Sequence, residues 1–194
     1  SNSSDENYED ISTYPFVEAE FGSSLDLNDL ANYANQTVPP YITKNNSQGN
    51  AITDKGATLG RVLFYDKNLS SNNNISCASC HSPFHAFTHV DHALSHGVDD
   101  SIGKRNALPL MNLAWQKQFM WDGSISDLDF FSRIPITHPK EMASTLEDVQ
   151  IKLKQSDSYA DLFLKAFGLS DSEILNQLDH PEYFTKTFKE YETI

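Results

Sequence analysis

Apolar residues recur every three or four positions in several segments of this chain, and no segment alternates convincingly with a period of two. Residues 54–65 show the pattern most clearly, because four apolar side chains share one helical face behind a cap at Thr53 or Asp54. These four are Leu59, Val62, Leu63 and Phe64. The pattern predicts an all-α fold in which helices are joined by long loops.

Capping signals predict further helices along the chain. Short helices are expected over residues 26–36 and 126–134. Residues 144–147 read Ser-Thr-Leu-Glu, a capping box that predicts a helix to about residue 155. The next helix is expected over 157–167 and should end at Gly168, because glycine tolerates the left-handed conformation that closes many helices.

The remaining segments predict two more helices and several loops. A second capping box begins at Ser170, and Pro181 suits the first position of a last helix. Residues 68–74 are polar and 82–104 are irregular in pattern. Residues 107–121 are strongly apolar, so we expect them to be buried.

Composition narrows the class of protein. The chain has 194 residues, of which 39% are hydrophobic, and a net charge of −13 that argues against nucleic acid or an anionic membrane as partner. No run of about 18 apolar residues occurs, so no membrane span is expected. Residues 1–24 are polar and acidic and predict a tail or an extended wrap. We therefore divide the chain into a lead-in, 1–50, and a folded domain, 51–194.

The most informative stretch is Cys77-Ala78-Ser79-Cys80-His81, a C-x-x-C-H run. Two thiols at this spacing each add to one vinyl group of a porphyrin, and the adjacent imidazole becomes an axial iron ligand. A zinc site would need two further ligands, which nearby histidines could supply. A redox or structural cysteine pair is the other alternative. The motif favours covalent haem c over both.

Four more histidines follow the motif at spacings of three or four: His85, His89, His92 and His96. Such spacing would line one face of a helix, but Pro83 and the turn residues nearby disfavour a continuous helix there. We therefore expect His85, His89 and His92 to lie in a loop or at the surface.

An ordered set of motifs gives the chain a more specific likeness from about residue 51 to about 168. It resembles the N-terminal haem domain of bacterial dihaem cytochrome c peroxidases and their MauG-type relatives. The matching runs are 59–66, 75–81, 103–107, 112–115, 121–123 and 139–142. The resemblance implies a cytochrome c-like haem domain, all-α, with long loops around the cofactor.

The resemblance also assigns roles residue by residue. Cys77 and Cys80 would hold the peroxidatic haem, and His81 would be the proximal iron ligand. Glu141 matches the distal carboxylate, which takes a proton from hydrogen peroxide and returns it to the leaving oxygen. A plain helix-terminal carboxylate is the alternative reading of Glu141. Pro135 matches a distal proline that shapes the pocket.

Four further positions complete the comparison. Trp121 matches the tryptophan that carries electrons between the haems, although a large indole is often only core. Asn106 matches a side-chain ligand of the family's calcium. His96 is the nearest match to a distal histidine that caps the iron in the resting state. Phe131 departs from the family, which has a glutamine there, so a polar group is missing.

The expected activity is reduction of hydrogen peroxide, with electrons from a small donor such as a cytochrome c or a cupredoxin. A MauG-type oxidase acting on a protein substrate is the alternative, and a single-haem electron carrier or sensor is a third. Only one C-x-x-C-H run is present. The family's second haem domain is therefore an expected missing partner, without which the domain could be inactive. Haem c attachment implies an exported, periplasmic bacterial chain.

Overall fold

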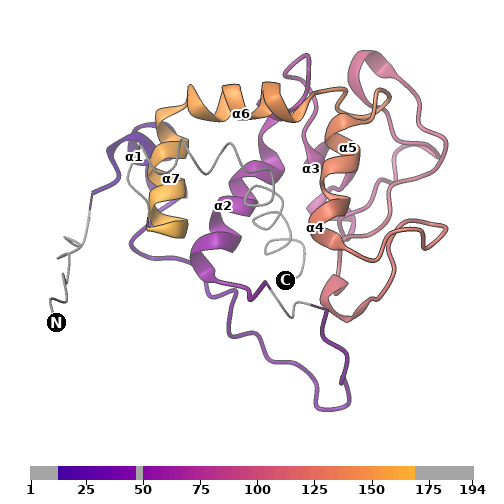
Figure 1. Ribbon diagram of the computed structural model, residues 1–194, viewed down its shortest axis with the longest axis horizontal. Helices are drawn as coiled ribbons and strands as arrows, with labels where there is room; N and C mark the ends of the chain where they lie inside the picture. Colours follow the sequence, from indigo (N-terminus) through magenta and orange to yellow (C-terminus); the bar gives the residue numbers. More distant parts are fainter. Residues whose placement is uncertain (1–12, 47–49, 169–194) are drawn as a thin grey trace, which may run out of the picture.

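The computed structural model describes residues 13–46 and 50–168 as a helical fold (Figure 1). The described α-helices are α1 (Pro15–Phe21), α2 (Asp54–Tyr65), α3 (Cys77–Cys80), α4 (Leu128–Phe131), α5 (Arg133–Thr137), α6 (Leu146–Lys154) and α7 (Asp157–Phe167). Short 3-10 turns are η1 (Gly22–Ser24), η2 (Lys67–Leu69), η3 (Pro83–His85), η4 (Val98–Asp100) and η5 (Leu113–Trp115). Within the described ranges extended pairing is limited to three isolated bridges, so the predicted all-α class is confirmed.

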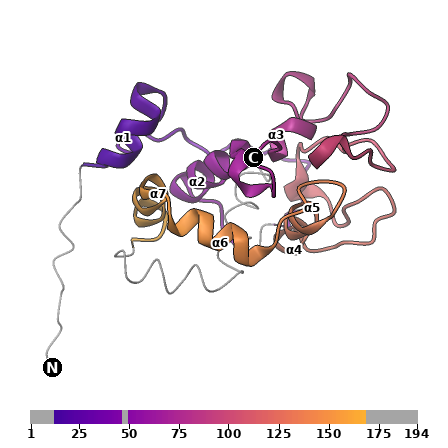
Figure 2. The same cartoon turned by 90° about the horizontal axis from the view of Figure 1, so that it is seen from above.

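The molecule has two unlike sides, which lie at opposite ends of both views (Figures 1 and 2). Helices α1, α2, α6 and α7, here called the helical base, enclose one large apolar cluster. Residues 82–127, here called the loop layer, form irregular chain on the other side, beside α3, α4 and α5. The irregular course predicted for 82–104 is confirmed.

The helical base forms where the sequence patterns are strongest. Helix α2 begins after Thr53, whose side chain accepts a hydrogen bond from the Gly56 N–H (3.0 Å) as an N-cap. Its predicted apolar stripe is largely buried, with Leu59 and Leu63 fully enclosed. Helix α7 ends at Gly168, whose φ of 68° gives the predicted left-handed closure.

Two helix boundaries differ from the prediction. The N-cap of α6 is Thr145, which accepts a hydrogen bond from the Asp148 N–H (3.0 Å), so the capping box does not start at Ser144. The helix predicted over 126–134 is two short helices, α4 and α5, which join at Ser132. Asp127 caps α4 with its side chain and so fixes the later start.

The N-terminal segment was predicted wrongly in two places. Residues 15–21 form α1 instead of a tail or an extended wrap, because Val17 is buried and Asp161 of α7 accepts hydrogen bonds from the Phe16 and Val17 N–H groups (2.9 and 3.1 Å). Residues 26–36 form turns, and no helix, since Asp54 holds the backbone there. The division at residue 50 stays a prediction.

The loop layer is held by backbone geometry more than by apolar contact. Several non-glycine residues take positive φ there: Ala86, Phe87, Asp99, Asp100, Asn112 and Met120. The expectation that 107–121 is buried holds for Leu113 and Phe119, but Met111 and Trp121 are exposed. None of the described helices is long and apolar enough to cross a membrane. The helices predicted at Ser170 and Pro181 lie outside the described residues.

Candidate functional site

The C-x-x-C-H run forms the short helix α3 and its C-terminal cap. Ser76 and Ser79 make reciprocal capping bonds, with the Ser76 N–H donating to Ser79 Oγ at 3.0 Å. One helical turn then separates Cys77 from Cys80. The two cysteines are not joined in a disulfide. The local sequence therefore sets the thiol spacing by itself.

His81 is held in one tautomer. Its Nδ1 lies 2.9 Å from the Phe87 carbonyl oxygen, which only accepts, so the proton is on Nδ1 and Nε2 carries the lone pair. Burial lowers the pKa of His81, against the opposing effect of backbone hydrogen bonds at Phe87 and Leu108. A neutral imidazole with an oriented Nδ1–H is the form that proteins present to a metal.

The environment of Cys80 disfavours the redox alternative. Burial raises the pKa of the Cys80 thiol, and the Glu141 carboxylate raises it further, against the Ser95 hydroxyl. Redox-active C-x-x-C pairs depend on a lowered thiol pKa. Among the described residues no group of three or more His, Cys, Asp or Glu side chains is arranged to hold a metal ion, so zinc gains no support.

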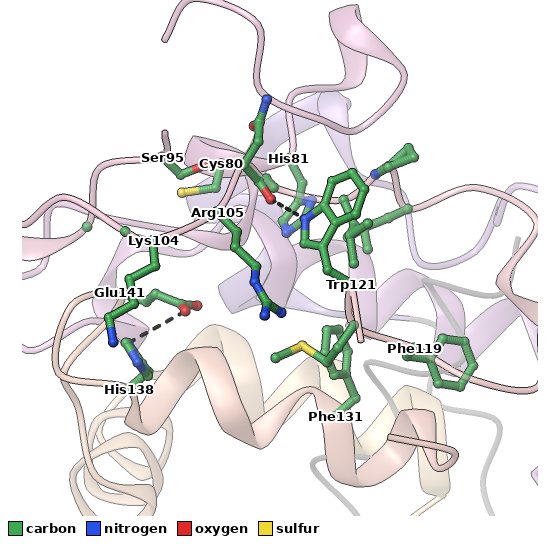
Figure 3. A pocket seen from close by; sticks show the side chains of 18 of the residues that line it. Cys80, His81, Ser95, Lys104, Arg105, Phe119, Trp121, Phe131, His138 and Glu141 are labelled. Carbon is green, nitrogen blue, oxygen red and sulfur yellow. Dashed lines mark hydrogen bonds and ion pairs between the residues drawn. The ribbon is translucent and has the colours of Figure 1, made fainter. Parts of the chain in front are cut away.

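A cavity of about 520 Å³ opens between α3, the loop layer and the segment after α5 (Figure 3). Cys80 and His81 contribute to one wall, and His138 and Glu141 contribute to another. Its apolar lining includes Leu108, Pro109, Leu110, Leu113, Phe119, Met120 and Phe131, and its cationic lining is Lys104, Arg105 and Lys140. The sequence motifs that are far apart in the chain therefore meet at one cavity.

The Glu141 segment is fixed from three directions. The Val98 N–H donates to the Glu141 carbonyl (2.8 Å), and the Ser71 N–H donates to the Met142 carbonyl (3.0 Å). The Met142 N–H donates to the Pro135 carbonyl (3.1 Å). These bonds tie the segment to the loop layer, to the lead-in of the C-x-x-C-H motif, and to α5.

Gly97 allows its loop to lie directly against the backbone of the Glu141 segment. A Cβ added there would lie 2.6 Å from the Glu141 carbonyl oxygen and 2.7 Å from its Cα, so only glycine fits without a backbone shift. The loop containing His96 and the segment containing Glu141 are therefore in direct backbone contact. The Cys80 thiol also donates to the His96 carbonyl, at 3.7 Å.

Glu141 has the electrostatics of an acid–base group. Burial raises the pKa of Glu141, while the nearby His138 lowers it when protonated. The Glu141 Oε1 lies 3.6 Å from His138 Nδ1, and both side chains are close to half exposed toward the cavity. A carboxyl group with a raised pKa beside open space suits proton transfer better than helix capping.

Trp121 lies on the cavity wall without being core, because 60% of its surface is exposed. Its indole Nε1–H donates to the Asn106 carbonyl oxygen (2.9 Å), which fixes the ring against the neighbouring loop. Within the described ranges the side-chain Oδ1 of Asn106 is buried without a hydrogen-bond partner. An amide oxygen suits calcium, but one ligand does not form a site, so calcium stays a prediction.

The other predicted site residues are placed as follows. His96 lines the cavity, and its Nδ1 lies 2.5 Å from Asp100 Oδ1. Phe131 lines it as well, and its ring packs 6.3 Å from that of Phe119. Pro135 and Cys77 are not among the lining residues, and Cys77 packs beside the helical base. Their roles stay predictions.

The loop histidines are more organised than predicted. The His89 and His92 rings are 5.5 Å apart between centroids, and the His92 and His96 rings are 4.8 Å apart. His85 and His92 are exposed, as expected of surface loop residues, whereas His89 is partly buried. Ring contacts within an irregular loop follow no sequence period, so the sequence pattern could not predict them.

The residues present fit a covalently attached haem. The neutral, oriented His81 supplies an iron ligand, and the largely apolar walls suit a flat macrocycle. Lys104 and Arg105 offer cations for the propionate groups. Asn106 Oδ1, a buried oxygen without a hydrogen-bond partner in the described chain, is a polar atom of the same lining.

Sequence reasoning missed three parts of this lining. Met120, at φ 70°, lines the cavity although no role was predicted for it from the sequence. His138 also lines the cavity. Its position three residues before Glu141, one turn away, could have indicated that the two side chains lie close together. Arg105, which belongs to the matching run 103–107, pairs with Asp122 at 3.4 Å.

Comparison with known proteins agrees with this geometry. A family model described as "Di-haem cytochrome c peroxidase" matches residues 54–194. The methylamine utilization protein MauG of Methylorubrum extorquens is 36% identical over 127 residues, which cover 62% of this chain and 34% of that protein. The cytochrome c551 peroxidase of Pseudomonas aeruginosa is 31% identical over 142 residues, covering 73% of this chain and 40% of that protein.

Solved structures show the same fold. A MauG-like protein associated with microbial copper homeostasis superposes with a TM-score of 0.67 at 25% identity, over 81% of this chain and 46% of that one. The diheme peroxidase BthA from Burkholderia thailandensis gives a TM-score of 0.63 at 21% identity, over 75% of this chain and 40% of that one.

The matched region covers only part of each of these relatives, between 34% and 46% of their length. Within that part, the haem-attachment motif, the cavity and the ordered motifs agree with one family description, whose members bind haem c and are oxidoreductases. The chain belongs to the di-haem cytochrome c peroxidase and MauG family, and has its all-α, cytochrome c-like fold.

Proposed function

We propose that this chain is a haem c peroxidase domain that reduces hydrogen peroxide with electrons from a small redox protein. Reduction of one peroxide to two waters breaks the O–O bond and consumes two electrons and two protons. The carrying observation is that one cavity is lined by both His81, the expected iron ligand, and Glu141, a carboxyl group with a raised pKa. A haem bound there would relay the electrons from the redox protein and would act as the Lewis acid.

The chain's own residues divide the remaining work. Cys77 and Cys80 would attach the haem, and His81, oriented by the Phe87 carbonyl, would bind the iron through Nε2. Glu141, as the carboxylate, would accept a proton from the peroxide oxygen that binds first and then deliver it to the leaving oxygen. Phe131 makes its part of the cavity wall apolar, because an aromatic ring stands where the family has a glutamine amide.

Electron supply from outside the chain completes the proposal. Trp121 is largely exposed while its indole is tied to the loop that lines the cavity, which suits a route between a partner and the haem. A cytochrome c or a cupredoxin is the proposed donor, delivering through the family's second haem domain. Because haem c is attached outside the bacterial cytoplasm, we infer an exported, periplasmic location.

The exposed Trp121 also favours a second candidate, a MauG-type oxidase that removes electrons from a protein substrate. The same indole would then pass electrons inward from that substrate. Met120 in the cavity lining favours a third candidate, a single-haem electron carrier or sensor. A methionine thioether is a strong axial iron ligand in such carriers. Glu141 separates the peroxide-reacting candidates from the carrier, which has no use for a distal base.

The test is Glu141→Gln in the haem-loaded chain. The reaction of the ferrous form with hydrogen peroxide should slow by about 10²-fold or more, because the amide cannot accept the proton. Stopped-flow absorption measures the rate, and the static spectrum and haem content should match the parent. Glu147→Gln, an exposed position on α6 outside the cavity lining, is the matched control and should react at the parent rate.

Two results would count against the proposal. A Glu141→Gln variant that reacts at the parent rate would remove the acid–base role and favour the carrier. Slowing of the Glu147→Gln control to the same extent would show that loss of surface charge, and no distal base, governs the rate.

A further inference from the structure

His138 and Glu141 lie on one tight turn after α5. His138 is the C-cap of that helix, and its carbonyl accepts hydrogen bonds from the N–H groups of Glu141 (3.0 Å) and Ala143 (3.1 Å). Ala143 takes a φ of 49° to close the turn. The backbone therefore sets the separation between the imidazole and the carboxylate, both of which reach the cavity (Figure 3).

One nitrogen of His138 faces two partners of opposite character. Nδ1 lies 3.2 Å from the Lys140 N–H, which donates, and 3.6 Å from Glu141 Oε1, which accepts. A neutral imidazole accepts from Lys140 through its Nδ1 lone pair. A protonated imidazole has no lone pair there and presents its proton to the carboxylate. Each protonation state of His138 thus has a partner in place.

His138 and Glu141 both reach solvent. The side chains of His138 and Glu141 are 44% and 47% exposed, so neither is sealed in the interior. The other titratable or charged side chains that line the cavity are Cys80, His81, His96, Lys104, Arg105 and Lys140. In the described part of the chain, His138 is the cation-forming group that forms an ion pair with Glu141.

We propose that His138 is a positioning residue that acts through Glu141, holding the carboxylate toward the cavity and exchanging protons between it and solvent. The proposal rests on the peroxidase function proposed above. A peroxide turnover takes up two protons, and a group that passes between two partnered states is suited to deliver them. No direct contact between His138 and the substrate is required.

The consequence is a defined pH dependence. When His138 is protonated, the imidazolium favours the ionised form of Glu141, which is the form that accepts the peroxide proton. Replacement of His138 by glutamine removes that charge. The acid side of the rate profile should then move to higher pH, by about one unit, while the rate at alkaline pH stays at the parent level.

The experiment compares His138→Gln with the parent in the haem-loaded chain, using stopped-flow rates with hydrogen peroxide from pH 5 to 9. His85→Gln, an exposed loop histidine that does not line the cavity, is the matched control and should leave the profile in place. Infrared difference titration of the Glu141 carboxyl band, assigned by its absence from Glu141→Gln, should show the same upward shift.

Each outcome decides the inference. An equal fall in rate at every pH would show a merely structural role for His138, and an unmoved profile would show no role. The double variant Glu141→Gln/His138→Gln should be no slower than Glu141→Gln alone, since His138 acts through the carboxylate. Further slowing would overturn that dependence. Failure of the proposed function is a separate result, in which Glu141→Gln itself reacts at the parent rate.

Discussion

The helical base and the loop layer solve different physical problems with chain of similar length. The base buries apolar side chains against one another, with Leu59, Leu63 and Leu162 almost wholly enclosed. The loop layer turns much of its apolar surface toward the cavity and is held by backbone hydrogen bonds and positive-φ turns. The first arrangement maximises burial, whereas the second leaves a cavity lined by polar and apolar side chains.

Hydrogen bonds from α6 of the helical base hold the chain segments that lead into the site. Lys152 of α6 donates three hydrogen bonds of 2.7–2.8 Å, to the carbonyls of Asn68 and Ser70 and to Asn73 Oδ1. The same loop carries Ser71, which binds the Met142 carbonyl. The base thereby fixes the lead-in to the C-x-x-C-H motif on one side and the Glu141 segment on the other.

The largest expected effect comes from a substitution that leaves a void in the core of the helical base. Phe163→Ala removes a ring that is 2% exposed and packs near Tyr159 and Phe167, at centroid distances of 6.4 and 5.8 Å. The free energy of unfolding should fall by about 3–5 kcal/mol, as measured by urea denaturation. The visible spectrum of the haem-loaded chain should not change if the regions are independent.

The control for this variant is Ile151→Ala on α6, where the side chain is 53% exposed and the loss should stay below about 1 kcal/mol. A changed haem spectrum in Phe163→Ala would contradict the division, because it would show that core packing sets the geometry of the cavity.

The reverse test crowds the loop layer. Gly97→Ala places a methyl group against the backbone of Lys140 and Glu141, which must shift at a cost of about 1–3 kcal/mol. The haem spectrum and the peroxide rate should both change, because the Glu141 segment moves. Gly103→Ala is the matched control, since its nearest contact is Ser95 O at 3.3 Å and the loop needs only a slight adjustment. Equal spectra for Gly97→Ala and the parent would refute the role of the close approach.

The smallest expected effect is a pH dependence of stability that involves the helical base alone. Burial raises the pKa of Tyr159 well above its usual value, with the Asp66 carboxylate and Glu20 adding to the effect. Its hydroxyl donates to Asp66 Oδ2 at 2.7 Å. A raised folded-state pKa means that this stability is complete below the unfolded pKa of about 10 and is lost as pH rises above it.

Tyr159→Phe should therefore lose about 1 kcal/mol at pH 7 and show a shallower decline of unfolding free energy above pH 10 than the parent. Tyr41→Phe, at a position that is 82% exposed, should behave as the parent does at both pH values. Urea denaturation at pH 7 and at pH 10.5 measures both effects. A parallel decline in parent and Tyr159→Phe would exclude this phenol as a source of alkaline instability.

The same contrast explains where sequence reasoning succeeded. Helices α2 and α7 were predictable because a cap, an apolar stripe and a terminal glycine all act within a few residues. The C-x-x-C-H motif is equally local, and its placement on α3 follows from adjacent serines. Helix α1 was missed because its stability comes from Asp161, more than 140 residues away.

The sequence by itself determined the all-α class, the C-x-x-C-H motif and, through ordered motifs, the family. Tertiary structure alone decided that Trp121 is exposed, that Met120 and His138 face the cavity, and that Gly97 contacts the Glu141 backbone. The reason is physical: caps and stripes depend on neighbours within one or two turns, whereas a cavity wall depends on which distant loops meet, and their contacts leave no period in the chain.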